Sequence, residues 1–355
     1  MIELTAETVP AWLARQGLAG EPAAVRAREL PLGVSNRTFW VERPEGPLVV
    51  KQARARLAVP MEWLADVGRI VREAEAMDWL HARLGPPEIP RLLALDRTDM
   101  ALAMEAIEPP AENYKTLLLA GQVDPELAGQ WGGLLARLHT VTQDAATRER
   151  FGDATFFEQL RMSPYYDTVA ERHPPLAARL SELRAECMRR TWCLVHGDYS
   201  AKNMLVRTVV QQGGAPRGRP QRGGPRPMRP GAGRVLILLD YEVAHFGNPS
   251  FDLAFALTDY LMKALHLPRH AADLLHAARV FWATYEARAG LPAASRAQAG
   301  SHLAAVMLAR VDGKSPFEYF TDERRQAQVR ELTGALLLGP VPTVPEVIAA
   351  VAARV

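Results

Sequence analysis

The sequence predicts an α+β fold in which a mostly antiparallel sheet with one long helix is followed by a mainly helical part. Three observations support this class. Between about residues 20 and 106, short β-prone runs alternate with turn signals such as Pro44–Pro47. The long pattern Trp63–Leu84 interrupts these runs with apolar residues at helical spacing. From Asn113 onward, helical patterns dominate the chain.

The composition fits a globular protein with no global case for a nucleic-acid or membrane partner. The chain has 355 residues, ordinary apolar content and a formal net charge of +2. Its beginning lacks a signal-peptide pattern, and no run of about 18 apolar residues predicts a membrane span. Cys187 and Cys193 do not make a disulfide framework, so we expect a reduced, cytoplasmic setting. No pattern indicates an oligomeric state.

The first part of the chain predicts a helix and then a strand–loop–strand–turn–strand meander. Thr5 or Thr8 is a candidate cap for the helix, which Gly17 ends. Polar residues near position 35 form the loop between the first two strands. The expected segments are a helix at Val9–Gln16 and strands at Ala24–Leu30, Thr38–Glu42 and Leu48–Gln52.

After the long helix, Pro86–Pro90 ends the pattern, and Arg91–Leu95 with Ala101–Met104 predicts a second hairpin. The later part is expected to be helical. Its helices are expected at Glu126–Thr142, Pro174–Arg190, Phe255–Ala264, Ala271–Ala289, Ala293–Arg310 and Glu323–Leu338.

Two stretches in the helical part carry the chemistry. Cys193–Val195 and Met204–Val206 are short apolar runs that flank a polar loop with Asp198 and Asn203 five residues apart. A carboxylate and a carboxamide on one loop suit a division of work, in which the first accepts a proton from a hydroxyl and the second coordinates Mg²⁺. The buried-strand pattern Val235–Leu239 then delivers two carboxylates, Asp240 and Glu242, whose oxygens suit a hard cation.

The motif His-Gly-Asp-x-x-x-x-Asn at 196–203, followed by Asp-x-Glu at 240–242, resembles the aminoglycoside phosphotransferase and choline kinase family of small-molecule kinases. The continuation Ala244–Ala254 resembles the same family. The resemblance implies a two-lobed, protein-kinase-like fold, with a nucleotide-binding lobe at 1–106 and a catalytic and substrate lobe at 107–355. It also implies ATP and Mg²⁺ as cofactors and a small-molecule hydroxyl acceptor as partner.

The resemblance assigns the catalytic and metal roles. Asp198 is the expected catalytic residue. Asn203 and Asp240 are the expected Mg²⁺ ligands, with a further metal contact from Glu242. His196 is expected to brace the loop through hydrogen bonds, because a proton-carrying role is not needed beside Asp198.

The resemblance also assigns the nucleotide-binding residues. Lys51, at the end of a Val-Val strand, is expected to hold the phosphates, with Glu73 as its carboxylate partner and Glu75 as the alternative. A two-residue offset turns about 200° around a helix, so only one of these glutamates can face Lys51. Three further nucleotide-binding residues are expected in the loop that covers the phosphates: Gly33, Ser35 and Asn36. The hinge is expected at Glu105–Ile107, where Glu105 and Ile107 pair with adenine.

Two residues outside the motif are expected to be structural. His139 resembles the family's Leu-His helix end, and we expect a buried histidine with a backbone partner. Asp252 is expected to bond the backbone of the catalytic loop, with a simple helix cap as the alternative.

The acceptor is expected to be sugar-like or an amino alcohol, with a methylthioribose-type sugar first and an aminoglycoside second. Val49–Ala53 and Met104–Pro110 resemble methylthioribose kinases, although that group has Ser where this chain has Asn203. Equal numbers of acidic and basic side chains after residue 241 weaken the case for a polycationic antibiotic. Arg310, Asp312 and Lys314 are candidates for lining the acceptor site, with a solvated loop as the alternative. The competing function is a non-catalytic, pseudokinase-like nucleotide-binding module.

The segment 208–233 is rich in Pro, Gly and Arg and contains no acidic residue. Its composition predicts a disordered excursion between two strands, since it has too little apolar surface to bury. We expect a tolerated insertion, with a basic tether for RNA or another polyanion as the alternative.

Overall fold

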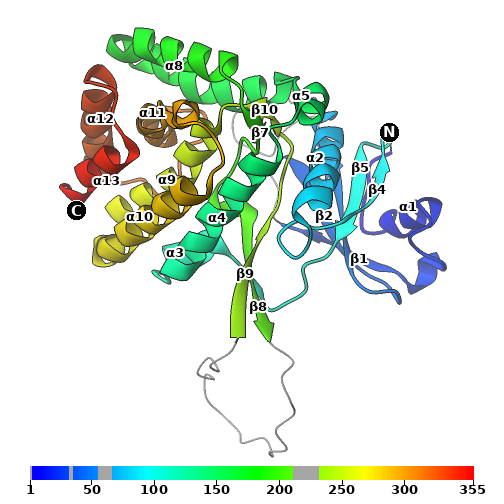
Figure 1. Cartoon of the computed structure of the whole chain (residues 1–355). Helices are drawn as coiled ribbons and strands as arrows, with labels where there is room; N and C mark the ends of the chain where they lie inside the picture. Colours follow the sequence, from blue (N-terminus) through cyan, green and yellow to red (C-terminus); the bar gives the residue numbers. More distant parts are fainter. Residues whose placement is uncertain (1, 32–34, 55–65, 211–231) are drawn as a thin grey trace, which may run out of the picture.

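The computed structural model describes residues 2–31, 35–54, 66–210 and 232–355 (Figure 1). In these ranges, every helix is too short or too polar to cross a membrane. Cys187 and Cys193 are buried and unpaired, as expected from the absence of a disulfide framework.

The first part of the chain forms an antiparallel sheet between two helices, as predicted. The strand order is β1-β2-β3-β5-β4. Alternating side chains point to opposite faces, so Ala101 and Ala103 pack against α1 while Leu102 and Met104 pack against α2. The bounds are α1 Val9–Arg15, β1 Arg26–Leu30, β2 Asn36–Glu42, β3 Leu48–Ala53, α2 Arg69–Leu84, β4 Leu92–Asp96 and β5 Ala101–Glu105.

The second part is helical and holds two small sheets. One has the order β6-β8-β9, and the other pairs β7 with β10. In Figure 1 the β8–β9 hairpin projects from the body, while α4, α9 and α10 lie together beside it. The strands are β6 Ala111–Asn113, β7 Cys193–Val195, β8 Met204–Val210, β9 Ala232–Leu238 and β10 His245–Gly247.

The helices of this part surround a long helix, α9, from Pro249 to His266, which is buried up to Leu265. A π-helical segment at Glu158–Asp167 lies between α6 and α7. The remaining helices are α3 Tyr114–Leu119, α4 Pro125–Val141, α5 Ala145–Phe151, α6 Thr155–Phe157, α7 Thr168–Arg172, α8 Ala177–Arg189, α10 Ala271–Arg288, α11 Ala299–Asp312, α12 Glu323–Leu338 and α13 Val344–Ala352.

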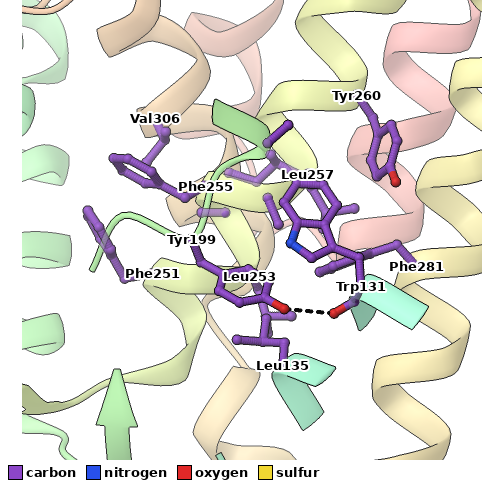
Figure 2. Packing of buried hydrophobic residues seen from close by; sticks show 14 of the residues in the cluster. Trp131, Leu135, Tyr199, Phe251, Leu253, Phe255, Leu257, Tyr260, Phe281 and Val306 are labelled. Atoms are coloured by element: carbon purple, nitrogen blue, oxygen red, sulfur yellow. Dashed lines mark hydrogen bonds between the residues drawn. The ribbon is translucent and has the colours of Figure 1, made fainter. Parts of the chain in front are cut away.

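Trp131 lies at the centre of the core of the helical part (Figure 2). Its ring is 5.2–5.6 Å from the rings of Tyr114, Tyr199, Tyr260 and Phe281. The Tyr199 hydroxyl donates to the Trp131 carbonyl at 2.9 Å. Since Tyr199 follows Asp198, the core fixes one end of the predicted catalytic loop.

Several predicted bounds were wrong. The first strand begins at Arg26, because Pro22–Ala24 forms a 3₁₀ turn, and the second begins at Asn36. Helix α9 begins at Pro249, where Asn248 caps it. Two further deviations concern the end of the chain. The segment expected as one helix from Ala293 is a 3₁₀ turn followed by α11, which continues to Asp312, and α13 was not predicted.

The expected excursion 208–233 was too long at both ends. Val210 pairs directly with Ala232, and Thr208 pairs with Arg234. The β8–β9 ladder therefore extends into the segment. Residues 211–231 lie outside the described part of the chain. The prediction that they are disordered therefore concerns residues that the structure does not describe.

Candidate active site

The backbone of the polar loop between β7 and β8 is held by hydrogen bonds to a side chain of α9. Asp252, in the first turn of α9, accepts hydrogen bonds from the backbone nitrogens of His196 (2.7 Å) and Gly197 (2.8 Å). This is the contact predicted for Asp252. Gly197 has φ +76°, and a Cβ there would lie 2.9 Å from Val243 Cγ2, so the turn requires glycine.

His196 braces the loop, as predicted. Its Nδ1 accepts from the backbone nitrogen of Asp198 at 3.1 Å, so Nε2 carries the proton and donates to the Leu239 carbonyl at 3.1 Å. Burial lowers the pKa of His196, which favours the neutral ring that these two contacts require. The histidine thereby ties the loop to the end of β9.

Asp198 is buried between two cations. Its Oδ2 lies 2.8 Å from Arg161 Nη2 and 2.9 Å from Lys202 Nζ. Burial alone would raise the pKa of Asp198, but the charges of Arg161 and Lys202 outweigh it and hold the pKa well below its usual range. Arg161 also donates from Nε to the Gly197 carbonyl at 2.9 Å, which fixes its guanidinium against the loop.

Asn203 and Asp240 lie side by side, because β8 and β9 are paired up to this point. The backbone nitrogen of Leu239 donates to the Asn203 carbonyl at 2.9 Å. Asn203 Nδ2 donates to the Asp198 carbonyl at 2.9 Å. Asn203 Oδ1 receives no hydrogen bond from the described residues. The Asn203 amide oxygen is therefore available as a ligand, next to the strand end that carries the Asp240 carboxylate. Asp240 has φ +69°, a conformation uncommon outside glycine and enriched in Asp and Asn.

These two side chains fit a Mg²⁺ ion that is bound together with phosphates. Mg²⁺ is typically held by one or two carboxylates with substrate phosphates, and it needs no cage of protein ligands. Consistent with this, no group of three or more His, Cys, Asp or Glu side chains within the described ranges forms a metal cage.

Glu242, the third predicted metal ligand, has a protein cation as its partner. Its Oε2 lies 3.1 Å from Nε of the buried Arg69, at the start of α2. The same guanidinium donates to the carbonyls of Ser35 and Arg54. Burial and the nearby charge of Asp240 raise the pKa of Glu242 to about 7. Glu242 thus connects the segment after β9 with the sheet part of the molecule.

Lys51 pairs with Glu73, the first of the two alternatives. Lys51 Nζ lies 2.5 Å from Glu73 Oε1 and 3.8 Å from Asp240 Oδ1. Burial would lower the pKa of Lys51, but the two carboxylates outweigh it and raise the pKa above its ordinary value. Glu75 faces elsewhere and binds Arg97 at 2.7 Å.

The other predicted nucleotide residues that the structure describes lie at or near the start of β2 and the end of β5. Asn36 Nδ2 is 3.4 Å from Glu73 Oε2. Gly33 lies outside the described residues. The backbone nitrogen of Glu105 donates to the Arg91 carbonyl at 2.9 Å, whereas the backbone groups of Ile107 form no hydrogen bond within the described part.

His139 is structural, but its partners are side chains and not the backbone. Nδ1 lies 2.9 Å from the Tyr285 hydroxyl and Nε2 lies 3.2 Å from Asp252 Oδ2. The prediction of a backbone partner was wrong, because α9 and α10 bring two polar side chains to this ring. His139 thereby supports the aspartate that holds the catalytic loop.

The three acceptor-site candidates differ in their surroundings. Asp312 is bound by His173 at 2.8 Å and by Arg330 at 2.7 Å, and it lies on a helix and not on a loop. Lys314 is exposed. Arg310 is buried among aromatic rings in α11.

Sequence reasoning missed four residues of the site, Arg161, Lys202, Arg69 and Asp259. Asp259 Oδ2 accepts from the backbone nitrogen of Ala201 at 2.8 Å, a second contact of α9 to the catalytic loop. Lys202 was visible inside the motif and lies four residues after Asp198. Arg161 and Arg69 belong to no motif, so only the packing reveals them.

The antiparallel sheet and the helical part together form a fold that solved small-molecule phosphotransferases share. Residues 26–215, more than half of the chain, match the family model described as "Phosphotransferase enzyme family". The chain belongs to this family.

Relatives by sequence are methylthioribose kinases 1 and 2 of Oryza sativa subsp. japonica. Each is 25% identical to this chain over 229 residues, which cover 56% of this chain and 53% of the relative. The chain thus spans about half the length of the curated relatives it matches.

Solved structures with the same fold include a proposed aminoglycoside phosphotransferase from Ralstonia eutropha. It is 17% identical with a TM-score of 0.55, and the match covers 94% of this chain and 98% of that one. An amicoumacin kinase in complex with AMP-PNP and Ca²⁺ is 11% identical with a TM-score of 0.54, and the match covers 92% of both chains. These likenesses support the fold, including its two-lobed, protein-kinase-like architecture.

Proposed function

We propose that the protein is an ATP-dependent small-molecule kinase that transfers the γ-phosphoryl group of Mg-ATP to a hydroxyl of a sugar-like or amino-alcohol acceptor. The observation that carries the proposal is the convergence of Asp198, Asn203, Asp240 and a carboxylate-paired Lys51. These are the parts that kinase-type phosphoryl transfer requires. They come from three separate segments, so their meeting is unlikely to be a by-product of one local motif.

The nucleotide is proposed to lie between the sheet and the helical part. Lys51, held by Glu73, would bind the phosphates, and Ser35 and Asn36 lie at the loop expected to cover them. The boundary between the lobes is proposed at residues 106 and 107. The backbone nitrogen of Glu105 is already hydrogen-bonded, whereas the backbone groups of Ile107 have no hydrogen bond to any described residue, so we assign the adenine contact to Ile107 first.

Asn203 and Asp240 would hold the Mg²⁺ ion that accompanies the nucleotide phosphates. When bound, the ion neutralises the charge that builds up on the phosphates during transfer. For Glu242, the ion pair with Arg69 favours a role in joining the lobes over a direct metal contact.

Asp198 would receive the acceptor hydroxyl. The P–O bond between the β- and γ-phosphates breaks, a new P–O bond forms to the acceptor oxygen, the hydroxyl proton passes to Asp198, and ADP leaves. Because Arg161 and Lys202 stabilise the ionised carboxylate, Asp198 is a weak base. Its main contribution is therefore to orient the hydroxyl, and it takes the proton late in the transfer.

The similarity to methylthioribose kinases supports a methylthioribose-type sugar as the first proposed acceptor, and an aminoglycoside is the second. The cations beside Asp198 disfavour a polycationic aminoglycoside. The competing function, a pseudokinase-like binding module, is disfavoured because a complete set of kinase residues is retained.

The test is Mg-ATP-dependent ADP release with a panel of acceptors, comparing the wild type with Asp198→Asn. The variant is expected to lose about 10²–10⁴-fold in turnover, while ATP affinity remains nearly unchanged because Asp198 does not bind the nucleotide. Loss of ATP binding in the variant would show that the role of Asp198 is misassigned. A wild type that binds ATP but turns over no acceptor would favour the pseudokinase.

A further inference from the structure

We propose that the acceptor carries an oxyanion, either a carboxylate or a phosphate, which Arg310 and Arg161 bind beside Asp198. This inference rests on the proposed function and narrows its substrate class. With this inference, a sugar phosphate or a hydroxy acid becomes the first candidate acceptor, ahead of a neutral sugar.

The first observation is a buried guanidinium without a carboxylate. Arg310 is only 6% exposed, and within the described ranges it forms no ion pair. Its Nη1 donates to the carbonyl of Ser315 at 3.0 Å, and its Nε is buried without a partner. A buried charge that lacks a counter-charge is costly, so such a group is poised to gain from an anionic ligand.

Aromatic rings hold this guanidinium in place. Arg310 Cζ lies 5.0 Å from the ring centres of Tyr165 and Phe255 and 4.6 Å from that of Phe317. These contacts orient a cation without neutralising it. They therefore leave Nε and Nη2, which has no hydrogen bond in the described part, as donors for a planar or tetrahedral oxyanion.

The second observation is that Arg161 shares one of these rings. Arg161 Cζ lies 5.9 Å from the Phe255 ring centre, so both guanidinium groups lie next to the same side chain. Arg161 is also the residue that contacts Asp198. The ring thus connects the unpaired cation to the point where the acceptor hydroxyl would sit.

The charges around Asp198 do not balance. Arg161, Lys202 and Arg310 all act on this one carboxylate. Most neighbouring carboxylates have their own partners, because Glu242 pairs with Arg69 and Glu73 with Lys51. Asp259 pairs with Lys263, and Asp312 pairs with Arg330. Asp240 is near Lys51, which Glu73 already pairs, so Asp198 and Asp240 together face the three cations. One positive charge therefore remains in excess.

The γ-phosphate of ATP is a second anion that would meet this charge. Lys202 is half-exposed and next to Asn203 in the sequence, so we assign Lys202 to ATP first. Arg310 comes from α11 and shares the Phe255 ring with Arg161, so we assign Arg310 to the acceptor. A role for Arg310 in binding ATP alone is a distinct outcome of the test.

The experiment uses matched acceptor pairs with Mg-ATP. Ribose is compared with ribose 5-phosphate, and glycerol with glycerate, so that the phosphate and carboxylate arms are separate. Methylthioribose serves as a neutral reference. We expect kcat/KM to be at least about tenfold higher for the anionic member of one pair. Binding of each compound is also measured directly by calorimetry in the presence of Mg-AMP-PNP.

The variants are Arg310→Gln, Arg310→Lys and, as a matched control, Arg324→Gln, which removes an equal charge from an exposed arginine of α12. We expect Arg310→Gln to raise KM for the anionic acceptor at least about tenfold, with kcat and the KM for ATP nearly unchanged. Arg310→Lys should recover part of the affinity, and Arg324→Gln should behave like the wild type. Melting curves check that each variant folds.

The two proposals fail in different ways. Preferred use of methylthioribose, ribose or glycerol by the wild type would overturn the oxyanion inference and leave the kinase intact. A change in the KM for ATP alone in Arg310→Gln would overturn it as well. If no acceptor is turned over, the kinase proposal fails, and calorimetry then decides the inference: equal binding of neutral and anionic compounds contradicts it.

Discussion

Glu73 and Glu75 lie two positions apart on α2, and the structure separates them by environment. Glu73 is fully buried against Lys51, whereas Glu75 lies at the surface with Arg97. Their different partners follow from the helical period, which turns the two side chains to different faces. The difference provides a matched pair of variants for the nucleotide site.

We expect Glu73→Gln to lower the free energy of unfolding by about 3 kcal/mol, because it leaves a buried lysine without its main counter-charge. ATP affinity should fall as well, since Lys51 loses the partner that fixes its rotamer. Glu75→Gln should cost less than about 1 kcal/mol, because its ion pair is partly exposed. Chemical denaturation and ATP titration check both variants, and similar effects of the two substitutions would contradict the pairing.

His245 supports a prediction on pH. Its ring is buried, stacks on Phe157 at 4.0 Å and lies 3.1 Å from the Val243 carbonyl through Nδ1. Burial lowers its pKa to about 4. Between pH 6.5 and 4 the unfolded chain therefore binds a proton that the folded protein does not bind, so stability falls as the pH decreases through this window.

This histidine should contribute a loss of about 3 kcal/mol between pH 6.5 and pH 4. The loss is measured as the difference between the wild type and His245→Gln in the pH dependence of the free energy of unfolding. Carboxylates titrate equally in both proteins and cancel in the difference. Parallel pH profiles would contradict a buried neutral His245.

Among the elements, α9 holds the loop between β7 and β8 in place. Asp252 and Asp259, two turns apart on this helix, accept hydrogen bonds from the catalytic loop at His196, Gly197 and Ala201. Residues seven positions apart share one face of a helix, so a single rigid element holds the loop at both ends. This explains how Asp198 can keep a fixed position beside Arg161 and Lys202.

The contact between α4 and α10 depends on Gly132. A Cβ at Gly132 would lie 2.3 Å from the backbone oxygen of Phe281, whereas a Cβ at Gly129 would meet its nearest neighbours at 3.6 Å. We expect Gly132→Ala to destabilise the protein by about 1–3 kcal/mol, since the two helices must move apart next to Trp131.

Gly129→Ala is the control on the same helix. It should stabilise the protein by up to about 1 kcal/mol, because alanine has the higher helix propensity and finds ordinary contact distances. Thermal and denaturant unfolding measure both effects. Stabilisation by both substitutions would show that α4 and α10 tolerate a wider separation.

At the scale of the whole molecule, the sheet part and the helical part meet through charged groups. Arg69 joins Glu242 to the carbonyls of Ser35 and Arg54, and Lys51 approaches Asp240. Both connections run from the sheet part to the segment after β9. We therefore expect a substitution in either part to shift the proposed nucleotide-binding and metal-binding residues.

The segment 211–231 can be tested as a whole because its flanks are paired. Val210 and Ala232 face each other in the β8–β9 ladder, so an Asn-Gly turn can close the hairpin directly. If the segment is a tolerated insertion, the chain with this replacement should keep the melting temperature and the turnover of the wild type.

Retention on heparin and on RNA is measured alongside turnover. Unchanged retention would support a tolerated insertion, while a clear loss of retention in the replaced chain would support the polyanion tether. Loss of folding would contradict both interpretations and assign the segment a structural role.

The sequence by itself determined the order of most elements and the polar loop between two strands, and it singled out Asp198, Asn203, Asp240 and Lys51 as candidate site residues. These features are local: the alternation of apolar residues specifies a strand, and the motif spans only eight positions. The resemblance favoured Glu73 over Glu75 as the partner of Lys51, and helix geometry allowed only one of the two to face it.

Only the tertiary structure decided which distant groups surround those residues. Arg161 reaches Asp198 from a π-helical segment, Arg69 reaches Glu242 from α2, and Arg310 shares Phe255 with Arg161. No pattern marks Arg161 and Arg69 in the chain, because a charged residue on a helix is usually solvated, whereas Arg310 was already a candidate for the acceptor site. The burial and the partners of these arginines arise from packing between segments far apart in sequence, and this packing sets the charge around Asp198.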